Sequence, residues 1–383
     1  MPPLRFAIPA VIAAWILAFE IPRFIYLLRI HPGANDFRLS YVAAQVGLRW
    51  GWAHMYDPEL LQQVVMASGY PDGAISSSYS YVNPPLLAWL AVPFTALPIT
   101  VAFYVWTAIN LAALIAAWRM AVQGSPFVSG VVLLGSISIW PTLYSLERGQ
   151  PVLLTYALAV GCWLMAARKR EVEAGILLGL AWALKPQDLA LLPLVLVVCG
   201  HGRAAAWWLA STTALWAIFA LVIGPTGLGT FLGVQVWIAS DPINTADTIA
   251  ILVGRGAPSL LAQALLALAA MLGTWRQRRN WDVAFAIGLA GSVVTALHVH
   301  EYDFVGLVVA AWIALRQPTP AAELAWLAIG VICAQALSIG DVLPMVLWPL
   351  GWLAMLSVRG TSMARILGPV SPDVGIPPGA GNK

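Results

Sequence analysis

Charge is scarce in this sequence. Asp, Glu, Lys and Arg together make up only 10% of the 383 residues, whereas hydrophobic residues make up 60%. Soluble domains carry about 25% charged residues, so the composition excludes a water-soluble enzyme and a disordered protein. The net charge is only +3, and the chain has no basic block of the kind that neutralises a nucleic-acid backbone. These absences predict a membrane protein.

Cysteine is almost absent too. Cys162, Cys199 and Cys333 lie far apart inside apolar runs, and this spacing fits neither a disulfide framework nor a zinc site. No carboxylate cluster of the Asp-x-Asp type is evident. We therefore predict neither a metal nor another cofactor.

Long apolar stretches, by contrast, follow one another along the chain. A helix that crosses a bilayer needs about 20 mostly apolar residues, and the 19 Trp, 27 Pro and 32 Gly suit membrane helices and their interfaces. We predict an all-α polytopic membrane helix bundle with about twelve spans. They lie near residues 6–28, 99–120, 126–146, 150–168, 172–185, 188–200, 204–224, 257–275, 281–300, 303–315, 320–337 and 341–358.

Lys and Arg set the expected orientation. The loops 168–170 and 276–279 are rich in these residues, and positively charged loops tend to stay in the cytoplasm. Both chain termini are then expected to be cytoplasmic, in a cell (inner) membrane. The loops at about 29–98 and 225–256 are expected on the outer side.

The first outer loop is the longest stretch that we do not expect to cross. Residues 36–50 mix apolar and polar side chains and predict a helix that lies at the membrane interface. Residues 84–98 are apolar and begin and end with proline. We expect that this stretch does not cross, because it is too short and too rich in proline. We take residues 1–365 as one membrane domain and expect residues 366–383, which are rich in Pro and Gly, to be a disordered cytoplasmic tail.

Placing an ionisable side chain at the centre of a membrane helix costs roughly 2.5–3.5 kcal/mol of free energy. Ionisable groups that persist beside the predicted spans, at their ends, are therefore candidate functional residues. The first is Asp36, in the sequence Asn-Asp-Phe directly after the first predicted span. A carboxylate at the bilayer edge can act as a general base. Asp is also a preferred helix N-cap, and both interpretations remain open from the sequence.

Two further candidates follow at outer turns. The sequence Glu-Arg-Gly-Gln forms a tight turn in which Arg148 could bind a phosphate and Gln150 a sugar, although a plain helix-hairpin turn is the alternative. Lys185 precedes a proline that ends the predicted helix, so its side chain is expected at the membrane edge. A compact ammonium group there suits a lipid phosphate. The alternative is a snorkelling lysine with Asp188 as its structural partner.

The last group ends another predicted span and consists of His298, His300, Glu301 and Asp303. So many polar side chains in six residues are hard to explain as packing. Two interpretations compete here, a metal site, which we do not favour, and a phosphate-binding or acid–base site. The His-x-His spacing is a weak zinc motif on a helix, because residues i and i+2 point to different faces. Tyr81 and Asn83 could line a sugar site, although aromatic residues at an interface are often membrane anchors.

Five motifs occur in a recognisable order. They are Asn-Asp-Phe after the first span, LRWGWAHMYD (48–57), YVNPPLLAWLAVPF (81–94), RGQPVLL (148–154) and AGILLGLAWALKPQ (174–187). This order resembles glycosyltransferase family 87, whose members are polytopic enzymes of the GT-C class. The resemblance covers roughly residues 30–200 by motif and the remainder by topology. The family includes mannosyltransferases that use polyprenyl-phosphate sugars as donors.

The resemblance implies a role for each matching residue. It implies that Asp36 takes the proton from the acceptor hydroxyl and that Gln150 and Lys185 lie near the donor. Lys185, with Arg148 or a histidine, would stabilise the charge on the leaving phosphate, and a single displacement would invert the anomeric carbon. Many members carry an adjacent histidine pair late in the chain. The nearest feature here is His-Val-His, which leaves open the histidine that matters and the sugar.

The hypothesis from the sequence is a membrane hexosyltransferase. It moves mannose or a related hexose or pentose from a polyprenyl-phosphate donor to a lipid or glycan acceptor on the outer face. A transporter or flippase for a lipid-linked or small polar solute is the main alternative, but transporters usually place polar groups at the bilayer midplane. A third alternative is a non-catalytic membrane scaffold, which would not need Asp36 or Lys185.

Overall fold

The computed structural model of the chain describes residues 4–30, 35–67, 81–240 and 242–360. Every regular element in these residues is a helix. The α-helices are α1 (Leu4–Ile30), α2 (Asn35–Trp50), α3 (Pro58–Ala67), α4 (Pro85–Ala91), α5 (Ile99–Ala121), α6 (Pro126–Ser138), α7 (Trp140–Arg148), α8 (Val152–Ala167), α9 (Glu171–Leu184), α10 (Leu192–Val198), α11 (Gly202–Ser240), α12 (Ala250–Val253), α13 (Ala257–Gln277), α14 (Trp281–Thr295), α15 (Val305–Ala314), α16 (Ala321–Ala336) and α17 (Leu343–Val358). The 3₁₀ helices are η1 (Trp52–His54), η2 (Val92–Ala96), η3 (Gln187–Leu189), η4 (Pro242–Thr245), η5 (Glu301–Phe304) and η6 (Leu337–Ile339).

Each of the twelve predicted spans coincides with a helix or a pair of helices. In the described residues, four helices are long and apolar enough to cross a membrane alone, namely α5, α11, α13 and α16. The number rises to five if α6 and α7, which meet at a 60° bend, form one span. The chain is thus a membrane helix bundle, and the number of twelve spans stays a prediction.

One predicted loop is helical instead. We expected residues 225–256 to be a loop, but α11 continues to Ser240 beyond a break at Gly224. Gly224 has φ 66° and ψ −179°, a conformation that is essentially reserved for glycine. Pro225 follows, and its fixed φ suits the first turn of a helix. The distal part of α11 reaches the first-loop segment, where Nε2 of Gln235 donates a hydrogen bond to the Val82 carbonyl at 2.9 Å.

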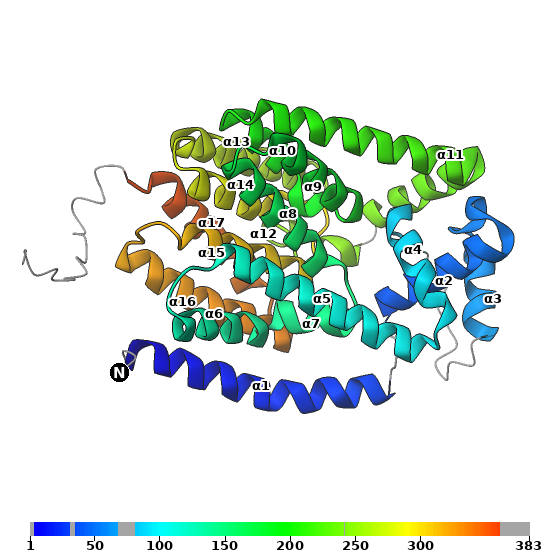
Figure 1. The fold of residues 1–383 in the computed structure, drawn as a ribbon, viewed down its shortest axis with the longest axis horizontal. Helices are drawn as coiled ribbons and strands as arrows, with labels where there is room; N and C mark the ends of the chain where they lie inside the picture. The colour runs from blue at the N-terminus through cyan, green and yellow to red at the C-terminus, as the bar shows by residue number, and fades with distance from the viewer. Residues whose placement is uncertain (1–3, 31–34, 68–80, 241, 361–383) are drawn as a thin grey trace, which may run out of the picture.

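Helices α2, α3 and α4 form a cap at one end of the long axis of the molecule (Figure 1). The helix predicted for residues 36–50 is confirmed as α2, and residues 84–98 form the two short helices α4 and η2. A second core, rich in aromatic side chains, joins the cap to α5 and includes Phe37, Tyr56, Tyr81, Phe103 and Trp106. The main core lies around α8, α14 and α15, whose facing side chains are almost all buried.

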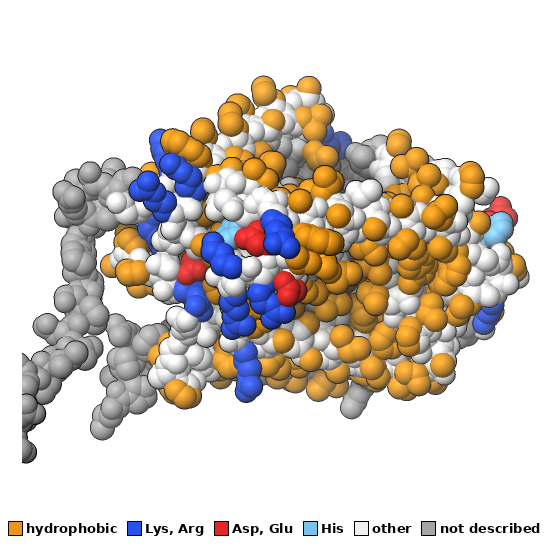
Figure 2. Space-filling model, turned by 45° about the horizontal axis from the view of Figure 1, so that its top comes forward, with side chains coloured by type: hydrophobic (Ala, Val, Ile, Leu, Met, Phe, Trp, Pro, Cys, Tyr) orange, Lys and Arg blue, Asp and Glu red, His pale blue; other side chains and the backbone are white. Residues whose placement is uncertain are grey.

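The opposite end, where the N-terminus lies (Figure 1), carries most of the exposed positive charge. Figure 2 shows Lys and Arg side chains gathered toward that end, beside a middle covered by hydrophobic side chains. We call it the basic end and define it by seven exposed residues, Arg168, Lys169, Arg170, Arg203, Arg276, Arg278 and Arg279. The two Arg-rich loops therefore share one end, as predicted. The predicted tail, residues 366–383, lies outside the described residues.

Candidate active site

The carboxylate of Asp36 contacts the main bundle. Because α2 begins at Asn35, Asp36 lies within the first helical turn rather than before it. Its Oδ2 accepts a hydrogen bond of 2.8 Å from Nε2 of Gln150, which is 114 residues away in sequence. Gln150 is buried and Asp36 is partly exposed. The structure thus brings together two of the candidates and leaves the carboxylate accessible.

Gly149 shapes the turn that presents Gln150. It ends α7 with φ 66°, in the left-handed region that favours glycine. A Cβ atom at Gly149 would lie 2.6 Å from the Cβ of Phe37 and 2.9 Å from the ring of Phe103. Nε1 of Trp106 donates a hydrogen bond to the Gly149 carbonyl at 2.8 Å. The predicted tight turn is therefore confirmed, and it is fixed by aromatic side chains of α2 and α5.

Arg148 is a half-buried cation beside this turn. Its Cζ lies 4.8 Å from the centroid of the Tyr144 ring, and its Nε has no hydrogen-bond partner. The carboxylates of Asp36 and Glu147 attract it electrostatically. Within the described residues, however, no carboxylate lies within ion-pair distance of Arg148. The guanidinium therefore has N–H groups that a bound anion could use.

Lys185, by contrast, is buried and paired. We expected Asp188 as its partner, but the closest carboxylate belongs to Asp303, 118 residues later. Oδ2 of Asp188 lies 3.9 Å from the ammonium, and neither Asp188 oxygen accepts a hydrogen bond. All three side chains are at most 5% exposed. Two buried carboxylates thus share one ammonium, which leaves a negative charge uncompensated unless one of them binds a proton.

The segment between α14 and α15 carries the last candidate group. Asp303 accepts a second hydrogen bond, from the backbone N–H of His300 at 3.0 Å, and its carbonyl accepts one from Tyr156 at 3.1 Å. The rings of His298 and His300 lie 4.6 Å apart. No group of three or more His, Cys, Asp or Glu side chains in the described part of the chain is arranged to hold a metal ion.

A series of aromatic rings that was not predicted from the sequence runs through the site. Trp140 stacks on Tyr144 at 5.2 Å, Tyr144 on Tyr302 at 5.9 Å, and His300 lies 5.3 Å from Tyr302. Nε1 of Trp140 donates a hydrogen bond to Glu301. Three cations lie over these rings, namely Arg23 over Trp140, Arg148 over Tyr144 and Lys185 over Tyr302. The spacing of Trp140 and Tyr144, four residues apart on one helix, was the signal that could have revealed the series.

Asp247 was also missed, because no motif marks it. It lies in the segment between α11 and α12, close enough to Glu301 and Asp303 for their charges to act on it. Burial, followed by the repulsion of those two carboxylates, raises the pKa of Asp247 to about 7. This carboxyl group is therefore poised to change charge near neutral pH.

Tyr81 and Asn83 make contacts inside the cap. The hydroxyl of Tyr81 donates to the Pro84 carbonyl and that of Tyr56 to the Asn83 carbonyl, each at 2.9 Å. The two tyrosine rings lie 5.3 Å apart, and Tyr81 is fully buried. These contacts fix the turn before α4.

Comparison with known proteins gives one match. Residues 81–338 match glycosyltransferase family 87, whereas no curated protein and no solved structure matches the chain. The matched region covers about two thirds of the chain and contains Arg148, Gln150, Lys185 and the histidine segment. Asp36 precedes it and joins it through the hydrogen bond to Gln150. The resemblance seen in the motifs is therefore confirmed, and the chain belongs to glycosyltransferase family 87, a family of membrane glycosyltransferases.

Proposed function

We propose that the protein transfers a sugar, mannose or a related hexose or pentose, from a polyprenyl-phosphate donor to a lipid or glycan acceptor. The observation that supports this most directly is the carboxylate of Asp36, hydrogen-bonded to Gln150 beside the guanidinium of Arg148. A lipid-linked donor stays in the bilayer, and its phosphate lies at the interface. We further propose that the cap end is the outer face of the cell membrane, so that the acceptor is glycosylated there.

Asp36 acts as the general base in this proposal. The acceptor oxygen attacks the anomeric carbon, its proton passes to the carboxylate, and the bond between the sugar and the phosphate breaks. A single displacement of this kind inverts the anomeric configuration. The side-chain N–H of Gln150 donates a hydrogen bond to Oδ2 of Asp36. This bond orients the carboxylate and leaves Oδ1 of Asp36 to accept the proton of the acceptor hydroxyl.

Arg148 is the cation that we assign to the donor phosphate. Its guanidinium can bind two phosphate oxygens at once, and within the described residues no carboxylate is paired with it. Lys185, which the sequence favoured for this role, is already paired with Asp303. We therefore assign Lys185 to a positioning role, in which it holds the segment with His298 and His300 against α9.

Transfer from a radiolabelled polyprenyl-phosphate sugar in proteoliposomes tests the proposal. Asp36→Asn should lower turnover at least about 10²-fold, in the range for loss of a general base. Asp57→Asn is the matched control. Asp57 caps α3 by accepting bonds from the N–H groups of Glu59 and Leu60, and Asn preserves the cap, so activity should be unchanged.

Two results would count against this assignment. Near-normal transfer by a folded Asp36→Asn variant would remove Asp36 as the base. Movement of labelled donor across the bilayer without any glycosylated product would instead favour the flippase alternative.

A further inference from the structure

The basic end has positive charge that the protein's own acids do not neutralise. Each acid there has a partner, and the contacts are Glu171 with His201, Glu173 with Arg170, Asp282 with Arg316, and Glu323 with Arg359. Six exposed cations have no ion pair within the described parts of the chain, namely Arg168, Lys169, Arg203, Arg276, Arg278 and Arg279. This surplus attracts anions to the surface.

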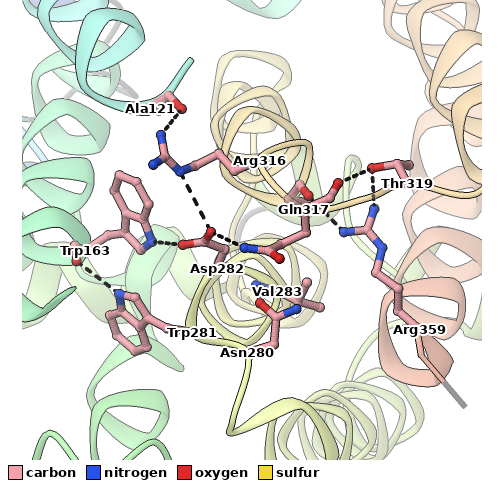
Figure 3. A network of polar contacts seen from close by, with 11 residues as sticks. Ala121, Trp163, Asn280, Trp281, Asp282, Val283, Arg316, Gln317, Thr319 and Arg359 are labelled. Carbon is pink, nitrogen blue, oxygen red and sulfur yellow. Dashed lines mark hydrogen bonds and ion pairs between the residues drawn. The ribbon is translucent and has the colours of Figure 1, made fainter. Parts of the chain in front are cut away.

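A polar hollow of about 320 Å³ lies among these charges. It is lined by Arg279, Asn280, Trp281, Asp282 and Gln317. Figure 3 shows how its one acid is already used, because the Asp282 carboxylate accepts bonds from Trp163 at 3.1 Å and Gln317 at 2.7 Å. Nε of Arg316 lies 3.8 Å from the same carboxylate and offsets its charge. Arg279 is then the uncompensated charge of the lining.

The surface beside the hollow suits an acyl chain. An exposed stripe runs along α13 and consists of Leu261, Leu265, Leu268, Leu272 and Trp275, each more than half exposed. The spacing of three or four residues places them on one face of the helix. The guanidinium of Arg278 lies 4.5 Å from the Trp275 ring, and Trp is favoured where a bilayer meets water. The stripe thus leads from apolar surface directly to the arginines.

We propose that this site binds one anionic phospholipid. The headgroup phosphate lies in the hollow against Arg279, with Arg278 next to it in the chain and over the Trp275 ring, and an acyl chain follows the stripe of α13. A soluble phosphate would use the arginines but not the leucines, so the stripe favours a membrane lipid. Each Arg or Lys close to an anionic lipid strengthens binding about fivefold. The inference does not depend on the proposed sugar transfer.

Lipid titration followed by native mass spectrometry tests the site. The delipidated protein in detergent is titrated with phosphatidylglycerol and, separately, with phosphatidylcholine. The wild type should retain phosphatidylglycerol at concentrations where phosphatidylcholine is lost. Arg278→Gln with Arg279→Gln should weaken phosphatidylglycerol binding roughly 10-fold or more, while the unfolding temperature stays that of the wild type.

The matched control removes two exposed arginines elsewhere. Arg49→Gln with Arg255→Gln also deletes one arginine beside a tryptophan, since Arg49 lies 6.0 Å from the Trp50 ring, and it should leave lipid binding unchanged. Equal retention of the two lipids, or equal losses in the two double variants, would overturn the proposal. Full displacement of the lipid by millimolar inorganic phosphate would also overturn it, because the site would then bind a soluble anion.

Discussion

Gly149 is the single residue on which the geometry of Gln150 most depends. In Gly149→Ala the left-handed φ costs about 1–3 kcal/mol. The added methyl meets Phe37 and Phe103 at under 3 Å, and such overpacking costs about another 1–3 kcal/mol. We expect a clear drop in the unfolding temperature in detergent, together with loss of sugar transfer.

Gly130 in α6 provides the control, because it has open space around its Cβ position and no positive φ. Gly130→Ala should leave stability unchanged or raise it by up to about 1 kcal/mol. Similar unfolding temperatures for the two alanine variants would show that the turn is not constrained as described.

Replacing each of the two carboxylates beside Lys185 by an amide should change the stability of the protein differently. Asp303→Asn breaks a buried ion pair and weakens the contact to the His300 N–H, so we expect a loss of about 3–5 kcal/mol. Asp188→Asn removes the surplus buried charge and should be neutral or stabilising. Unfolding measurements on both variants test this order, and a larger loss in Asp188→Asn would show that Asp188 is the principal partner.

Asp247 should make stability fall as the pH rises. Because its pKa is raised to about 7, the folded state holds the proton more tightly than the unfolded chain does. The resulting stabilisation is complete below about pH 4 and is lost as the pH rises through about 7. Asp247→Asn should therefore match the wild type at pH 4 and exceed its stability at pH 8, by at most about 4 kcal/mol, reduced by the solvent that screens this partly exposed carboxyl group.

Thermal unfolding across that pH range measures the effect of Asp247→Asn. The exposed residue Asp341 serves as the control, and Asp341→Asn should leave the pH dependence as it is in the wild type. A parallel pH dependence in Asp247→Asn and the wild type would contradict the assignment.

Single residues were predictable where their contacts are local. The tight turn at Gly149 follows from its neighbours, because glycine after a helix is a common terminator. The partner of Lys185 could not be predicted, since Asp303 is 118 residues away and Asp188 is only three. Asp36 was found from its position directly after the first predicted span and from the family motif, and its contact with Gln150 required the fold.

At the scale of an element, the break in α11 decides where its distal half lies. Gly224→Ala should be strained by its φ of 66°, and the distal half should lose the Gln235 contact with the Val82 carbonyl. We expect a lower unfolding temperature and faster proteolytic cleavage at Arg255. Gly233→Ala, in the same helix with open space around it, should do neither, and equal behaviour of the two variants would argue against the break as the cause.

Helices were predicted better than their interruptions. The apolar runs predicted α5, α13 and α16 to within a few residues, because a run of about 20 apolar residues is the signal of a membrane helix. The bend between α6 and α7 was missed, although Pro141 stands at the start of α7. A proline permits both a kink and a new first turn, and only packing against neighbours decides between them.

For the whole molecule, the cap end and the basic end should lie on opposite sides of the membrane. Single cysteines at the exposed positions Glu59 and Arg278, in a background without the three native cysteines, should react with an impermeant thiol reagent from opposite sides. The cysteine at position 278 should be cytoplasmic. Labelling of both cysteines from one side would overturn the orientation and the proposed outer-face reaction.

The position of α1 has a consequence for how the protein is made. This helix packs chiefly against α6 and α7, which begin about 100 residues later, so at usual rates of translation it waits roughly 5–20 s for them. Glu20 and Arg23 form an ion pair of 3.0 Å within α1 itself. Because both partners belong to α1, this ion pair can form before Trp140 is synthesised, and in the folded protein Arg23 lies over the Trp140 ring.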